Sequence, residues 1–383
     1  MKVGVPKETF PGERRVAISP ASLLVLTKSG IEVIVESGAG ELAGYPDSAY
    51  VTKGAMIAST RADVFAADAI AQVRAAGENL NHGVDDLQYM RPGQWIIASC
   101  DALSNREAAE AIAKTGATLF ALELIPRITR AQSMDILSSQ ATIAGYRAVL
   151  TAAMELHKML PMMMTAAGTL SAAKIFILGA GVAGLQAIAT SKRMGGIVYG
   201  YDLRTACREQ VESLGGKFVE LNIVNSNSED KGGYAKAMDE DFYRQQREQL
   251  AQTIAQCDVV ITTAAIPGRK SPLLVTAEAV RSMQPGSVVV DLAAQRGGNC
   301  ALTVADQRVV DSGVTILGPT NIASDAAYHA SLMFGNNVTK FLQNMVKAGQ
   351  ANINMEDEIV RETMVTRDGQ VVHPKLQSMP QAA

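Results

Sequence analysis

One stretch of the sequence, residues 174–202, limits the possible folds more than any other. It opens with an apolar run, Lys174–Leu178, whose β-branched and aromatic residues favour a strand. A glycine turn of the form GxGxxG follows, and then an alanine-rich segment to residue 194 that has the composition of a helix. A second strand is expected at residues 196–201. This order of strand, glycine turn, helix and strand is typical of the βαβ unit that binds dinucleotides.

Each glycine of the turn has its own task. Gly179 permits the tight turn after the strand, Gly181 lets the backbone approach a pyrophosphate, and Gly184 lets the helix lie close to the strand. The phosphates would then face a helix N-terminus, where free N–H groups and the helix dipole favour negative charge. The predicted nucleotide contacts in this turn are Gly179, Ala180, Gly181, Val182, Ala183 and Gly184. The alternative is a glycine-rich turn with a structural role only.

The acidic residue Asp202 bears on which dinucleotide binds. It follows the second strand, roughly 20 residues after the turn, where such units place a carboxylate on the adenosine ribose. That carboxylate can accept hydrogen bonds from a free ribose 2′-OH, whereas it would repel a 2′-phosphate, so NAD(H) is favoured over NADP(H). Leu203 and Arg204 are expected beside it. Arg204 is the one contrary hint, and the alternative for it is a solvated loop cation.

Length and composition predict a soluble α/β protein of about two domains, because the chain has 383 residues, 48% of them hydrophobic and 19% charged. The formal net charge of −3 gives no reason to expect nucleic acid or an anionic membrane surface as a partner. Four widely spaced cysteines without a CxxC pair favour reduced thiols in the cytosol, and no metal site is expected. With no long apolar stretch and no signal core, the polypeptide is predicted not to cross a membrane itself.

Strand-like and helix-like segments alternate up to about residue 124 and again from the glycine turn onward, which predicts parallel sheets with helices on their faces. A helix at residues 138–160, capped by Ser138 or Ser139, would lead into the second domain, and its methionine-rich end would pack at the domain junction. We therefore predict two doubly wound, Rossmann-like α/β domains with a cleft between them. The first comprises residues 1–137 and 328–383, and the second, residues 138–327, binds NAD(H).

Two further segments are expected near a bound nucleotide. Residues 222–241 are polar and too long for an ordinary connection, so they form either a disordered insert or a lid, with Tyr234 suited to cover a flat ligand. A strand at residues 257–264 ends in small residues at the carboxyl edge of the sheet. Backbone could pass close to a ligand there, at Ala264, Ala265, Ile266 and Pro267.

Residues 2–8, 13–17 and 266–275, together with the glycine turn, resemble the family that contains alanine dehydrogenase and the NAD(H)-binding component of the proton-translocating nicotinamide nucleotide transhydrogenase. The resemblance covers essentially the whole chain. Alanine dehydrogenase uses a lysine and a histidine to hold and protonate its keto acid, whereas this sequence has Arg74 and Ser99 at the corresponding places. Oxidation of an amino acid needs a positioned base, but hydride transfer between two nicotinamides does not. The resemblance therefore favours the transhydrogenase branch.

Residues 126–138 are similar to the transhydrogenase loop that encloses the nicotinamide. The resemblance implies that Arg127 reaches the pyrophosphate region and partners Asp135. It also implies that Gln132 and Ser138 position the nicotinamide carboxamide and ribose. These four residues are the predicted catalytic set. The alternative is an Arg127–Asp135 ion pair that only ties an interdomain hinge.

The same resemblance implies a mobile loop at about residues 222–241, a homodimer, and two partners in the same enzyme. One partner would bind NADP(H), and the other would span the membrane and conduct protons. The chain would then be cytoplasmic, peripheral on the cytoplasmic face of the inner membrane. The expected reaction is direct hydride transfer between NADH and NADP⁺, coupled to proton translocation through the membrane partner. The alternatives are an amino acid oxidoreductase of the alanine dehydrogenase type and a non-enzymatic sensor of NADH.

Overall fold

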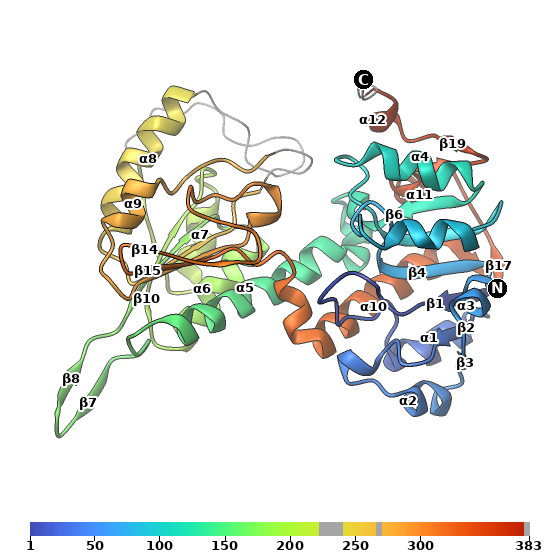
Figure 1. Ribbon diagram of the computed structural model, residues 1–383, viewed down its shortest axis with the longest axis horizontal. Helices are drawn as coiled ribbons and strands as arrows, with labels where there is room; N and C mark the ends of the chain where they lie inside the picture. The colour runs from blue at the N-terminus through green and yellow to red at the C-terminus, as the bar shows by residue number, and fades with distance from the viewer. Residues whose placement is uncertain (222–239, 266–269, 379–383) are drawn as a thin grey trace. The chain divides into compact units, whose positions relative to one another are not determined.

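The computed structural model describes residues 1–221, 240–265 and 270–378. The chain forms two compact units, shown in Figure 1. Unit 1 comprises Met1–Gln140 and Ala323–Ala383, and unit 2 comprises Ala141–Ile322. Each unit is built on a largely parallel sheet, and the predicted fold class of two Rossmann-like α/β domains is confirmed.

Unit 1 contains a six-stranded parallel sheet in the order β3-β2-β1-β4-β5-β6. The strands are β1 (Lys2–Val5), β2 (Glu32–Glu36), β3 (Met56–Ala58), β4 (Ala69–Arg74), β5 (Trp95–Ser99) and β6 (Thr118–Ala121). The helices are α1 (Leu23–Lys28), α2 (Asp47–Thr52), α3 (Arg61–Phe65), α4 (Arg106–Lys114), α10 (Ala327–Met345), α11 (Glu358–Thr363) and α12 (Pro374–Gln377). Two short hairpins complete the unit: β16 (Val346–Lys347) with β17 (Gln350–Ala351), and β18 (Thr366–Arg367) with β19 (Gln370–Val371).

Alternate residues of the strands in unit 1 point to opposite faces of the sheet, and each face has its own core. Val3 and Ile97 pack on one face in a cluster that includes Phe341 of α10. Ile70 and Ile112, the latter from α4, belong to the cluster on the other face. Because both faces are covered, the strands are apolar along their whole length, and β4 is buried throughout.

Unit 2 contains a seven-stranded sheet in the order β11-β10-β9-β12-β13-β15-β14, parallel except for the last pair. The strands are β9 (Lys174–Leu178), β10 (Ile197–Tyr201), β11 (Lys217–Phe218), β12 (Val259–Thr262), β13 (Val288–Asp291), β14 (Arg308–Asp311) and β15 (Val314–Leu317). The helices are α6 (Val182–Arg193), α7 (Cys207–Ser213), α8 (Glu240–Ile254) and α9 (Ala277–Arg281). The sheet order reverses between β9 and β12, so the glycine turn after β9 lies at the switch point, where such sheets bind ligands.

Helix α5 (Ile136–Glu155) contains the boundary between the units. The prediction of a helix at residues 138–160 is correct in kind but wrong at both ends. Its N-terminal cap is Asp135 and not Ser138 or Ser139: the Asp135 Oδ1 atom accepts a hydrogen bond from the Ser138 backbone N–H at 2.9 Å. An aspartate side chain at this point satisfies a helix N–H group that has no partner within the helix.

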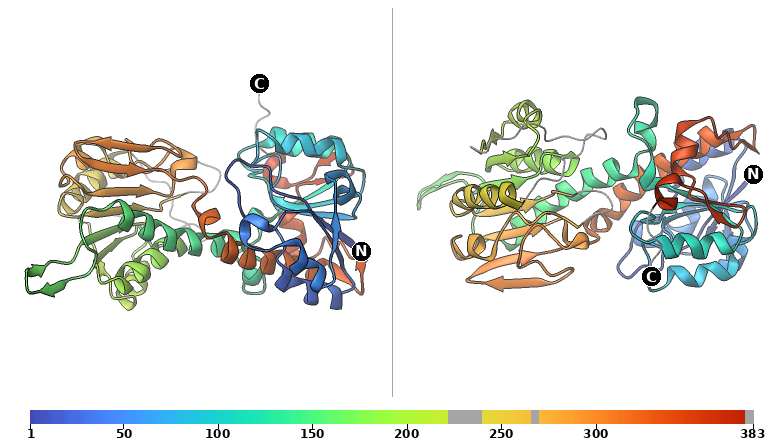
Figure 2. Two further views of the ribbon diagram at one scale, coloured as in Figure 1. Left: turned by 60° about the horizontal axis from the view of Figure 1, so that its bottom comes forward. Right: turned by 90° about the horizontal axis from the view of Figure 1, so that it is seen from above.

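The segment after α5 forms a hairpin that the sequence did not predict, β7 (Met163–Thr165) with β8 (Gly168–Leu170). It projects from the body of unit 2 in Figures 1 and 2. Every residue of both strands is exposed. The expectation that these methionines pack at a domain junction is therefore wrong for unit 2, where Met154 is 84% exposed and Met164 is 78% exposed.

Across the described residues, no helix is both long enough and apolar enough to span a membrane. All four cysteines are buried, and no disulfide joins them.

Candidate nucleotide-binding site

The glycine turn after β9 has the strained geometry that the sequence predicts. Gly179 has a φ of +103°, and a Cβ atom there would lie 2.5 Å from the Thr263 Oγ1 atom. Its N–H donates a hydrogen bond to the Tyr201 carbonyl at 2.8 Å, which ties the turn to the end of β10. A larger residue would therefore be excluded at this position both by its backbone conformation and by lack of space.

Gly184 lets α6 approach the turn closely. A Cβ atom at this position would lie 1.7 Å from the Gly179 carbonyl oxygen. Gly145 of α5 permits a second close approach, because a Cβ atom there would meet the Ala183 carbonyl oxygen at 2.1 Å. The two glycines hold the N-terminal turn of α6 against its neighbours.

Gly181 differs from the other two glycines of the turn. It caps α6 in an extended conformation, and a Cβ atom on it would meet no protein atom within 4 Å. The first turn of α6, all of it within the described residues, contains no acidic side chain. An anion such as a pyrophosphate fits this position, because the helix N-terminus provides N–H groups and a positive end of the dipole.

The Asp202 side chain lies against this turn, and the residue is 8% exposed. Its Oδ2 atom accepts a hydrogen bond from the Ala180 N–H at 2.7 Å. Arg204 covers the same carboxylate, with its Nε atom 2.9 Å from Oδ1 and its Nη2 atom 3.0 Å from Oδ2. The alternative of a solvated cation for Arg204 is therefore wrong. Leu203 between them is half-buried.

A buried polar network fixes the backbone at the end of β12. The Asn299 side chain is fully buried, accepts a hydrogen bond from the Ala264 N–H at 3.0 Å and donates to the Ala264 and Pro272 carbonyls, both at 2.8 Å. Asp291 holds Asn299 in turn by accepting from its backbone N–H at 2.7 Å. The sequence did not predict this role, although an aspartate at a strand end was a visible signal. Asn299 thereby positions Ala264 and Ala265 at the carboxyl edge of the sheet.

Three of the predicted contacts, Tyr234, Ile266 and Pro267, lie outside the described residues, as does most of the predicted mobile loop. The last two residues of that loop, Glu240 and Asp241, are not loop residues, because they begin α8.

The predicted nicotinamide loop belongs to unit 1, where a short 3-10 turn (Thr129–Met134) precedes Asp135. Ala131 is fully buried, and the Asn337 side chain of α10 donates to the Ser133 carbonyl at 2.8 Å, so the loop is anchored on the core of unit 1. Asp135 accepts hydrogen bonds from both the N–H and the Oγ–H of Ser138, at 2.9 and 2.6 Å. Arg127 and Gln132 are exposed. The pairing of Arg127 with Asp135 stays a prediction.

Arg74 and Ser99 lie opposite each other at the ends of β4 and β5. Arg74 contacts Glu13 and Glu78, and the Ser99 hydroxyl donates to Glu78. A carboxylate nearby, Glu8, accepts from the Val73 N–H at 2.6 Å. Burial, and then the charge of Glu13, raise the pKa of Glu8 to about 8.

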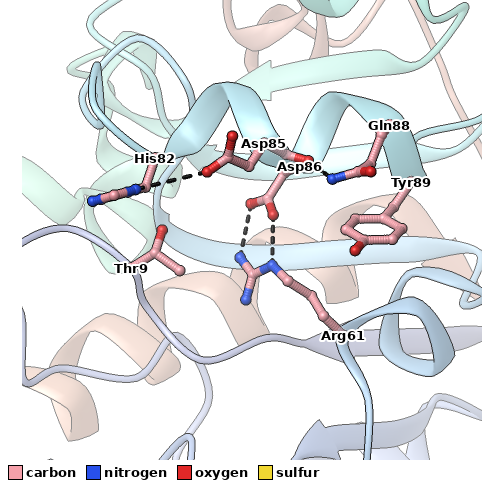
Figure 3. Close-up of a pocket in the computed structure, with 7 residues that line it drawn as sticks. All are labelled: Thr9, Arg61, His82, Asp85, Asp86, Gln88 and Tyr89. Carbon is pink, nitrogen blue, oxygen red and sulfur yellow. Dashed lines mark hydrogen bonds and ion pairs between the residues drawn. The ribbon is translucent and has the colours of Figure 1, made fainter.

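Two pockets lie away from the glycine turn. One of about 420 Å³ is in unit 1, where Arg61 forms two hydrogen bonds with Asp86, at 2.5 and 2.8 Å (Figure 3). It contains none of the predicted nucleotide contacts. The other, of about 760 Å³, includes Lys174 and Asp258 and so lies at the amino ends of the strands of unit 2. Ligands of parallel sheets bind at the opposite, carboxyl edge.

Comparison with known proteins gives full-length matches. Residues 4–144 match the family model described as alanine dehydrogenase/PNT, N-terminal domain, and residues 148–374 match the corresponding C-terminal domain. The chain is 47% identical to the first of the polypeptides named NAD(P) transhydrogenase subunit alpha in Rhodospirillum rubrum. That match extends over 380 residues, which cover 98% of this chain and 99% of that one.

Solved structures agree with this result. The crystal structure of a transhydrogenase from Sinorhizobium meliloti matches with a TM-score of 0.85 and 45% identity, covering 98% of this chain and 99% of that one. An L-alanine dehydrogenase matches with a TM-score of 0.82 and 25% identity, covering 98% of each chain. The two kinds of enzyme share the fold, while identity is higher to the transhydrogenases.

Proposed function

This chain belongs to the alanine dehydrogenase/PNT family, as its motifs predicted, and we propose that it is the NAD(H)-binding subunit of a proton-translocating NAD(P) transhydrogenase. In this proposal unit 2 binds NAD(H), a partner subunit presents NADP(H), and hydride passes directly between the two nicotinamides. The main support is the contact between the Asp202 carboxylate and the glycine turn, which suits a ribose with a free 2′-OH.

The residues of unit 2 would hold the adenosine half of the nucleotide. The N-terminal turn of α6, open beside Gly181, would bind the pyrophosphate. Asp202 would accept hydrogen bonds from the ribose hydroxyls, and Arg204 would move aside or share the carboxylate. Ala264 and Ala265, fixed by Asn299, would give the nucleotide a close backbone surface.

The loop of unit 1 would orient the nicotinamide half. Gln132 and Ser138 would position the carboxamide and ribose, Asp135 would fix the Ser138 hydroxyl, and Arg127 would reach the pyrophosphate region. When bound, the dihydronicotinamide supplies the hydride. Transfer from one nicotinamide to another moves no proton to or from nitrogen or oxygen, so the chain needs to orient its ligand and exclude water but needs no general base.

The exposed β7–β8 hairpin supports a homodimer. A two-stranded hairpin on its own is marginally stable in water, and this one exposes apolar side chains, with Met162 at 59%, Met164 at 78% and Leu170 at 48% exposure. A second copy of the chain would cover it. The other proposed partners are an NADP(H)-binding component and a membrane-spanning proton conductor, which would place the chain on the cytoplasmic face of the inner membrane.

The proposal is tested by mixing the purified chain with a purified NADP(H)-binding component, NADPH and an NAD⁺ analogue whose reduced form absorbs separately. Hydride transfer should require both proteins, and the chain alone should bind NADH but turn over little. Rapid reduction of NAD⁺ by alanine with the chain alone would instead identify an alanine dehydrogenase. NADH binding without any transfer in the mixture would favour a nucleotide sensor.

A further inference from the structure

Charged side chains gather at the carboxyl ends of β4 and β5 in unit 1, and the proposed function does not use them. In a sheet of this topology, ligands bind outside the carboxyl ends of the strands, near the pair where the strand order reverses. In unit 1 that pair is β1 and β4. Arg74 ends β4 and Ser99 ends the neighbouring β5, directly opposite in register.

The Arg74 guanidinium is held rigidly on its inner side. Its Nε atom donates to the Glu13 Oε2 atom at 3.1 Å, and its Cζ atom lies 4.3 Å from the centre of the Phe10 ring. Glu13 is fully buried and also accepts from the Arg15 Nε and Nη2 atoms, at 2.8 and 2.7 Å. Arg74 therefore has little freedom to change its orientation.

Glu78 occupies the outer side of this cluster. One carboxylate oxygen is 3.0 Å from the Arg74 Nη1 atom, and the other accepts from the Ser99 hydroxyl at 2.7 Å. A guanidinium and a hydroxyl that each take one oxygen would bind the carboxylate of a small free acid in the same way. The Glu78 side chain is 20% exposed, whereas that of Arg74 is 6% exposed. Glu78 thus stands between Arg74 and solvent.

We propose that Glu78 is a built-in occupant of an anion site formed by Arg74 and Ser99, and that it excludes small monocarboxylic acids from unit 1. The Arg15 and Arg74 cations are balanced by the Glu13 and Glu78 carboxylates. Without Glu78, one cation at an almost buried position would lack its balancing charge, which is costly unless another anion takes its place. The inference does not depend on hydride transfer, and either conclusion can fail alone.

The test is the substitution Glu78→Ala, which vacates the space that the carboxylate fills. Thermal unfolding is followed by fluorescence of Trp95, the single tryptophan, which begins β5 and so reports on the strand that carries Ser99. Each protein is measured in sodium acetate and in sodium chloride at equal ionic strength. In chloride, Glu78→Ala should unfold at a lower temperature than wild type, and acetate should restore the midpoint with a saturable dependence on its concentration.

Two matched variants separate a site from a general salt effect. Glu110→Ala removes the partner of Arg106 in another Glu–Arg pair of unit 1, at 2.7 Å, and should respond equally to acetate and chloride. Glu78→Gln keeps the shape of the side chain and should gain no acetate response. NADH affinity should be unchanged in all three variants.

Direct binding is measured by saturation-transfer NMR with acetate as the probe. Acetate should bind Glu78→Ala at least tenfold more tightly than wild type. Equal midpoints of Glu78→Ala in acetate and chloride, or equal acetate binding by wild type, would overturn the proposal. If the variant is recovered unfolded, refolding in the two salts decides: recovery in acetate alone supports the proposal, and failure in both overturns it.

Discussion

Substitution of Asn299 by alanine should weaken NADH binding although Asn299 is fully buried and so cannot itself contact the nucleotide. The change removes hydrogen bonds to the Ala264 N–H and to the Ala264 and Pro272 carbonyls. Leaving a buried backbone group without a partner costs about 1–3 kcal/mol. Because water can reach part of this loop, we expect a total loss of about 2–5 kcal/mol in the free energy of unfolding of unit 2.

The assay separates the two units. Trp95 fluorescence reports urea unfolding of unit 1, whereas circular dichroism reports both units. Asn299→Ala should therefore shift the dichroism transition and leave the Trp95 transition unchanged. NADH affinity should fall about tenfold or more, which corresponds to a loss of about 1.4 kcal/mol of binding free energy.

Asn105→Ala is the matched control. Asn105 caps α4 in unit 1, where its side chain accepts from the Ala108 N–H at 3.2 Å. Its loss should cost about 1 kcal/mol, move the Trp95 transition and leave NADH affinity unchanged. If Asn299→Ala binds NADH within twofold of wild type, the end of β12 does not form part of the nucleotide site.

Three further predictions address other parts of the chain. Asp135→Asn keeps an oxygen that can accept from the Ser138 N–H, so the fold should survive while NADH affinity and partner-dependent hydride transfer fall severalfold; if both are unchanged, the assignment of the loop is wrong. Burial, and then Glu13, raise the pKa of Glu8 from 4.5 to about 8, so the folded chain holds this proton more tightly than the unfolded chain. The stability that the proton contributes is complete below about pH 4.5 and is lost as the pH rises to about 8, by at most about 1.4 kcal/mol per pH unit. Glu8→Gln should remove this dependence, and a stability difference from wild type that stays constant between pH 5 and pH 8 would refute it. Met164→Asp should weaken the homodimer in sedimentation experiments without changing the fold, and an unchanged dimer would show that the hairpin is not the interface.

The sequence predicted most of the secondary structure around the glycine turn because the determinants there are local. Lys174–Leu178 forms β9 as expected, and α6 and β10 differ from their predicted bounds by a residue or so. Two strands were missed. β3 has only three residues at a sheet edge, and β14 pairs with β15 as an antiparallel edge strand whose side chains are exposed or half-buried. Neither has the apolar run that marks a buried strand.

The contacts that organise the candidate site could not be predicted, because they join residues far apart in the chain. Asn299 holds Ala264 across 35 residues, and Arg74 meets Glu13 across 61. Arg204 is only two residues from Asp202, but its pairing depends on how the loop after β10 turns. Spacing and composition identified the residue types, whereas the fold determined which of them meet.

The most direct test of the central claim is calorimetric titration of the wild-type chain with NADH and with NADPH. The account predicts that NADH binds at least tenfold more tightly, because the Asp202 carboxylate accepts from a ribose hydroxyl but repels a phosphate. Asp202→Asn should narrow that ratio. Equal or tighter binding of NADPH by the wild-type chain would contradict the assignment of unit 2 as the NAD(H) site.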